Sequence, residues 1–114
     1  MQVRAVTKHL PISPQKLRLV CDEVRGMDAE QALTVLEYMP HKGSELVGKT
    51  LASALANATN NFDLDPTDMY VSEIYAGEGP RLKRYKAGAR GRYKPRVKRT
   101  SHLWVILAER EEEN

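Results

Sequence analysis

The sequence predicts an α+β fold, in which three helices pack on a small antiparallel sheet and a long β-hairpin projects from that body. Apolar residues recur at helical spacing in three segments before residue 60, and two later segments are rich in β-branched and aromatic residues. The stretch between these two later segments is strongly cationic. The chain has 114 residues, the usual length of one domain. We therefore expect a single domain over residues 1–114, with an extended basic β-hairpin over residues 79–100.

The first predicted helix begins at Pro14 and ends before Gly26. Ser13 is a preferred N-cap, and proline is tolerated at the first helical position. Gly26 supplies the left-handed residue that commonly ends a helix. Its buried face is predicted from the residues at helical spacing, which are Leu17, Val20, Cys21 and Val24.

Two further helices are predicted before the strands. Asp28 and Gln31 form a capping-box pattern, and the apolar stripe that follows stops at Pro40. The third helix is predicted from Ser44 to Asn57. We expect a loop after it because turn-forming residues follow, namely Asn60, Asn61, Asp63, Asp65 and Pro66.

Three segments are predicted as strands. Gln2–Lys8 alternates weakly, whereas Met69–Ala76 is rich in β-branched and aromatic residues. Ser101–Ala108 is nearly continuously apolar, which indicates either that both its faces are covered or that the helices cover one of them. Trp104, in this last strand, is expected to be a core residue.

Opposite charges are segregated along the chain. Ten basic residues and no acidic residue lie between Arg81 and Arg99, and residues 1–18 hold four more basic residues, again without an acid. Residues 19–80 hold three basic residues against eleven acidic ones. The net charge of +3 therefore conceals a cationic segment of the kind that binds polyanions.

We call Gly79–Thr100 the basic arm. Cations occupy both sides of its alternation, so neither face suits a core, and Gly88 and Gly91 predict a turn near its middle. Folded in half, the segment would extend about 35 Å, whereas a body of ~100 residues has a radius of gyration of about 13 Å. We expect nucleic acid to stabilise this ribbon from both sides; a solvated, disordered loop is the alternative.

RNA is favoured over DNA as the partner of the basic arm. Proteins that insert a helix into the DNA major groove carry their cations on that helix, whereas these cations lie in an extended segment. Tyr85 and Tyr93 lie between the cations and have the chemistry to stack on unpaired bases.

Other function classes lack their usual signatures. A nucleic-acid enzyme needs clustered carboxylates or a positioned base, and the basic arm has no carboxylate, so we expect no catalytic residue and no small-molecule substrate. A membrane anchor usually needs a cationic amphipathic helix, and the predicted helices are acidic on balance. The longest apolar run, Leu103–Ala108, is far below the ~20 residues of a membrane span. We therefore expect no membrane partner. We also expect no metal and no cofactor, because the three histidines lack ligand spacing. The single cysteine, Cys21, fits a core position. It indicates the cytosol, or the lumen of an organelle with a cytosol-like redox state.

Four stretches of the chain, in this order, resemble the bacterial type of the large-subunit ribosomal protein family uL22. They are Ser13–Gly26, Gln31–Leu36, Ala52–Asn60 and Gly79–His102. The resemblance implies a structural protein of the cytoplasmic ribosome that binds large-subunit ribosomal RNA, contacts neighbouring ribosomal proteins and bridges RNA domains during assembly. It also implies that the body lies near the exit of the polypeptide tunnel, and that the hairpin tip lines the tunnel and meets the nascent polypeptide.

The charge pattern and the resemblance together define the candidate site residues. The residues expected to bind RNA are Arg4, Lys8, Lys16, Arg18, Arg81, Lys83, Arg84, Lys86, Arg90, Arg92, Lys94, Arg96, Lys98, Arg99 and His102. The residues that the resemblance places along the tunnel are Leu82, Lys83, Arg84, Arg90, Gly91 and Arg92.

Overall fold

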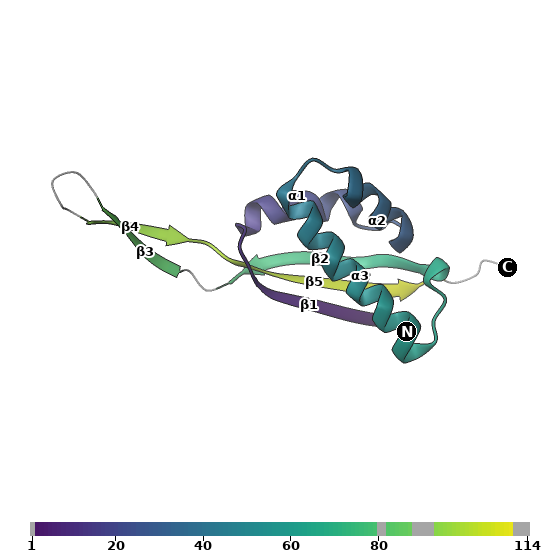
Figure 1. The fold of residues 1–114 in the computed structure, drawn as a ribbon. Helices are drawn as coiled ribbons and strands as arrows, with labels where there is room; N and C mark the ends of the chain where they lie inside the picture. The colour runs from purple at the N-terminus through teal and green to yellow at the C-terminus, as the bar shows by residue number, and fades with distance from the viewer. Residues whose placement is uncertain (1, 80–81, 88–92, 111–114) are drawn as a thin grey trace.

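The computed structural model describes residues 2–79, 82–87 and 93–110, and it confirms the α+β fold (Figure 1). A three-stranded antiparallel sheet carries all three helices on one face (Figure 1). The helices are α1 (Pro14–Val24), α2 (Ala29–Tyr38) and α3 (Lys42–Phe62). The strands lie in the order β1 (Gln2–Leu10), β5 (Ser101–Glu109) and β2 (Met69–Glu78), and a short 3-10 helix, η1 (Pro66–Asp68), precedes β2.

The other two strands, β3 (Leu82–Ala87) and β4 (Tyr93–Lys98), form a separate two-stranded sheet that projects from the body (Figure 1). The projection makes the molecule elongated, with overall extents of 72 × 26 × 18 Å. Of the helices in the described ranges, none combines the length and the apolarity needed to cross a membrane.

The central strand, β5, separates the two faces of the sheet. Its residues Ser101, Leu103, Val105 and Leu107 are fully buried beneath the helices. The alternate residues, His102, Trp104, Ile106 and Ala108, are only partly buried. The helices therefore cover one face of this strand, one of the two predicted arrangements. The prediction that Trp104 is a core residue is wrong, because Trp104 lies on the face that the helices leave open.

Helix α3 is longer than the sequence predicted. Asn60 and Asn61 are helical rather than part of a loop, and the helix ends at Phe62. Asp63, which follows, has a left-handed φ of 52° and donates its N–H to the Ala58 carbonyl. Asparagine is a weak helix former, but most helical stability in proteins comes from packing of the apolar face. The buried side chains along α3 supply that packing; they include Val47, Leu51, Leu55 and Ala58.

The predicted caps form differently from expectation. Ser13 and Asp28 precede α1 and α2 as predicted, but neither side chain makes a capping hydrogen bond. The backbone carbonyl of Ser13 accepts from the Leu17 N–H, and the Asp28 carboxylate pairs with Arg110 beyond β5. Gly26 has the predicted left-handed conformation, with a φ of 84°.

Cys21 is fully buried on the inner face of α1, as predicted. Burial raises the pKa of the Cys21 thiol from 9.0 to about 11. The unfolded chain therefore releases this proton at lower pH than the folded chain, and the folded state loses stability as the pH rises from about 9 to about 11. We expect urea titrations at pH 8 and pH 11 to show a loss of about 2 kcal/mol in wild type beyond that in the Cys21→Ala variant. Parallel losses in the two proteins would contradict this prediction.

Candidate nucleic-acid interface

The basic arm continues the hairpin that β2 and β5 form in the body. The β2–β5 ladder ends where Glu78 pairs with Ser101, and the Gly79 N–H then donates to the Thr100 carbonyl at 2.9 Å. Beyond this bond β3 pairs with β4 in an antiparallel ladder from Leu82↔Lys98 to Ala87↔Tyr93. The described part of the arm is thus a two-stranded ribbon, as the predicted hairpin requires.

The register of the ribbon groups its cations unequally. Five of the six cations in the two strands belong to one set of alternate pairs, Leu82↔Lys98, Arg84↔Arg96 and Lys86↔Lys94. The other set is Lys83↔Val97, Tyr85↔Pro95 and Ala87↔Tyr93. Alternate pairs of an antiparallel ladder lie on opposite faces, so one face holds most of the charge and the other holds both tyrosine positions. The register sets Arg84 opposite Arg96 and Lys86 opposite Lys94, and like charges directly opposite each other are destabilising.

The four cations predicted in the first 18 residues lie on two different layers. Arg4 and Lys8 are exposed on β1 and alternate with Val3 and Ala5, which are buried under the helices. Lys16 and Arg18 are exposed on α1, in the helix layer. The structure therefore presents the body cations as two pairs and not as one patch.

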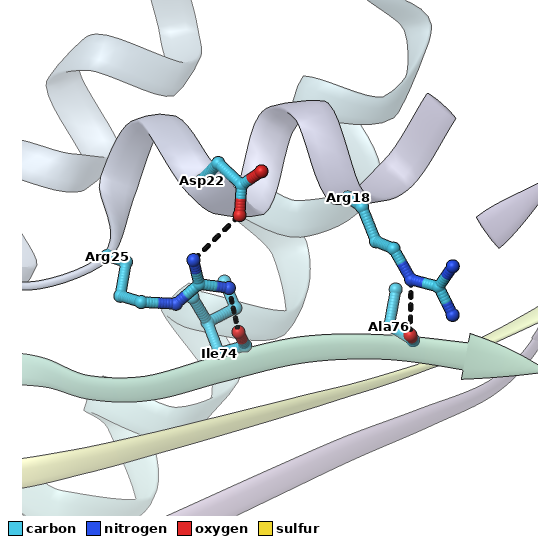
Figure 2. A network of polar contacts seen from close by, with 5 residues as sticks. All are labelled: Arg18, Asp22, Arg25, Ile74 and Ala76. Atoms are coloured by element: carbon cyan, nitrogen blue, oxygen red, sulfur yellow. Dashed lines mark hydrogen bonds and ion pairs between the residues drawn. The ribbon is translucent and has the colours of Figure 1, made fainter. Parts of the chain in front are cut away.

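Two arginines, one on α1 and one directly after its C-terminal end, cover the free edge of β2 (Figure 2). Arg18 Nε donates to the Ala76 carbonyl at 3.1 Å, and Arg25 Nη2 donates to the Ile74 carbonyl at 2.7 Å. An edge strand exposes unpaired backbone groups, so these bonds protect β2 against addition of another strand. Among the described residues the terminal amino groups of Arg18 make no hydrogen bond with the protein. Arg25 also pairs with Asp22 at 2.6 Å.

Two residues at the root of the basic arm were missed by sequence reasoning. Ser101 is fully buried, and its Oγ donates to the Ile12 carbonyl at 2.5 Å, which ties β5 to the connection between β1 and α1. At Gly79 an added Cβ would lie 2.5 Å from Thr100 Oγ1, so a side chain where the arm begins would force Thr100 to shift. In the sequence, Ser101 lies in the cationic run Lys98–His102, and a serine in such a run does not by itself indicate a buried hydrogen bond.

We expect the Ser101→Ala variant to lose about 1–3 kcal/mol of unfolding free energy, because the buried Ile12 carbonyl loses its donor. Urea denaturation of the variant and wild type measures this loss. Ser53→Ala is the matched control: Ser53 is exposed on α3, and its replacement should change stability by no more than about 0.5 kcal/mol. Equal stability of the two variants would show that the Ser101 bond contributes nothing net.

The other predicted site residues fall into three groups. Arg99 is exposed, whereas His102 is partly buried and its Nδ1 accepts from the His9 backbone N–H at 3.1 Å. The cations of β3 and β4 lie in the ribbon described above. Arg81, Arg90, Gly91 and Arg92 lie outside the described residues. Within the described ranges, no group of three or more His, Cys, Asp or Glu residues is placed to hold a metal ion.

Comparisons with known proteins cover almost the whole chain. A family model described as ribosomal protein L22p/L17e matches residues 5–108. A protein of Carboxydothermus hydrogenoformans named large ribosomal subunit protein uL22 is 47% identical over 112 residues, which cover 98% of this chain and 99% of the relative. A protein of the same name from Thermomicrobium roseum is 49% identical over 109 residues, covering 96% of this chain and 92% of the relative.

Proposed function

Because this chain belongs to the ribosomal protein L22p/L17e family, we propose that it is a structural constituent of the large ribosomal subunit in the cytoplasm. It binds large-subunit ribosomal RNA and neighbouring ribosomal proteins, and it has no catalytic role. The observation that carries the proposal is the basic arm, a two-stranded ribbon outside the core with ten cations and no acid between Arg81 and Arg99.

The arm binds RNA by charge and by stacking. Its cationic set of pairs neutralises phosphates, and each neutralised phosphate releases condensed counterions. Tyr85 and Tyr93, on the other set of pairs, stack on unpaired bases. The bound RNA also relieves the repulsion between Arg84 and Arg96 and between Lys86 and Lys94.

The body adds contacts on both of its layers. Arg4 and Lys8 bind RNA on the open face of the sheet, and Lys16 and Arg18 bind it from α1. A protein that contacts RNA on two layers and along an arm joins segments that are distant from one another. This geometry supports a role in bridging RNA domains during assembly.

The family assignment supports a place for the arm in the polypeptide exit tunnel. In this proposal the segment of Leu82, Lys83 and Arg84 lies along the tunnel, and Arg90, Gly91 and Arg92 meet the nascent polypeptide. A crosslinker attached at position 84, in ribosomes stalled on a nascent chain, tests this contact.

The test of the proposed function is sedimentation of the tagged chain through a sucrose gradient at high salt, beside a variant that lacks residues 84–94. We expect the full chain to move with the large subunit and the variant to remain largely at the top. The double variant Lys42→Gln and Lys49→Gln, which changes exposed cations of α3, should sediment like the full chain. If the full chain itself leaves the particle at moderate salt, it is a peripheral polyanion binder and the proposal fails.

A further inference from the structure

We propose that the open face of the sheet is a second RNA site, on which an unpaired base stacks against Tyr75, the exposed end of a row of rings that includes Trp104. This inference rests on the proposed function, because it adds a stacking site on the body to the RNA-binding arm. Neither residue was among the predicted site residues.

The first observation is an aromatic row across the open face. Tyr75 and Trp104 are cross-strand partners on β2 and β5, and their rings are stacked with centroids 5.1 Å apart and an interplanar angle of 19°. His102 meets Trp104 edge to face at 5.9 Å, and His9 meets His102 in the same way at 5.0 Å. Four rings therefore run in sequence across the sheet, and Tyr75, at the end of the row, is 46% exposed.

The second observation is the space made for the indole ring. An added Cβ at Gly77 would lie 2.9 Å from Cζ3 of Trp104, so the indole lies close to the backbone of β2, where a side chain at position 77 would force it to shift. The ring of Trp104 is thus held between the Gly77 backbone and the Tyr75 ring. A rigid aromatic surface of this kind binds a base at low entropic cost, since its rings are already ordered.

The third observation is the charge around the row. Val6 pairs with Trp104, and the neighbouring outward residues of β1, Arg4 and Lys8, are exposed cations. Glu73 is the acidic residue on the same face of β2, so the two cations outnumber it. β5 leads from this face directly into the basic arm through Arg99, which is exposed. Cations beside ordered rings, continuous with a polyanion-binding segment, favour single-stranded RNA over an apolar protein segment.

The experiment uses Trp104 as its own reporter, because it is the chain's single tryptophan. We expect an eight-nucleotide single-stranded oligoadenylate to quench the Trp104 fluorescence of the full chain, and a duplex RNA of equal length to quench it much less. The Tyr75→Leu substitution should weaken the oligonucleotide affinity measured by Trp104 quenching about fivefold or more. Tyr75→Phe, which keeps the ring, should restore it.

The matched control is Tyr38→Leu, since Tyr38 is an 80% exposed tyrosine on α2, away from the open face. Its affinity should equal that of wild type. Absence of quenching in a chain that still binds large-subunit ribosomal RNA would overturn this inference and leave the proposed function standing. Equal loss in the Tyr75 and Tyr38 variants, equal quenching by the duplex, or a concentration-dependent change in Trp104 fluorescence without RNA would also overturn it. If the wild-type chain does not bind ribosomal RNA at all, the proposed function is refuted instead.

Discussion

Replacing four cations of the basic arm by glutamine (Arg84, Lys86, Lys94 and Arg96) will weaken binding to large-subunit ribosomal RNA several-hundred-fold at 0.1 M salt. These residues form two like-charged cross-strand pairs on one set of the ladder. If each neutralises one phosphate, their removal lowers the slope of log affinity against log salt by about 2.8, at about 0.7 per phosphate of a single strand. Extrapolated from 1 M to 0.1 M salt, this slope change corresponds to roughly 600-fold in affinity. Filter binding at several salt concentrations measures both quantities.

The matched comparison sets a double variant of the basic arm against a double variant of α3. The Arg84→Gln and Arg96→Gln double variant should show about half the slope change of the fourfold variant. The Lys42→Gln and Lys49→Gln double variant should bind like wild type, because these lysines are exposed on α3. Thermal melting of the body should be unchanged in all variants, since the ribbon lies in a sheet of its own. A large drop in melting temperature in the arm variants would show that the arm is part of the folded core.

The Leu103→Ala substitution will lower the stability of the body and leave the salt dependence of RNA binding unchanged. Leu103 is fully buried on the central strand, and truncation of such a residue costs about 2–5 kcal/mol of unfolding free energy. For a domain of this size the loss corresponds to a fall in melting temperature of about 10 °C or more. Urea denaturation and thermal melting measure it.

Leu19→Ala is the control for this leucine, because Leu19 is 65% exposed on α1 and its truncation should cost no more than about 0.5 kcal/mol. Below its melting temperature the Leu103→Ala variant should bind RNA with wild-type salt dependence, because the arm retains its cations. A variant that remains folded but has lost the salt dependence would show that the core and the arm do not act separately.

The sequence by itself determined the features that depend on local order along the chain. The buried stripe of α1 follows from the spacing of Leu17, Val20, Cys21 and Val24, and all four are buried. The left-handed residue at Gly26 follows from glycine's lack of a side chain. The separation of a cationic arm from an acidic body also needs no structure, since it follows from the order of the charged residues along the chain.

Tertiary structure decided which face each strand residue occupies and how the arm is anchored. Ser101–Ala108 is apolar on both sides of its alternation, so the packing of α3 on one face, and not periodicity, left Trp104 on the other. The Ser101 bond to Ile12 joins residues 89 positions apart, and the Arg18 bond to Ala76 joins residues 58 apart. Such contacts have no local signal, because a hydrogen bond between distant residues depends on where the folded chain brings them and not on the residues beside them.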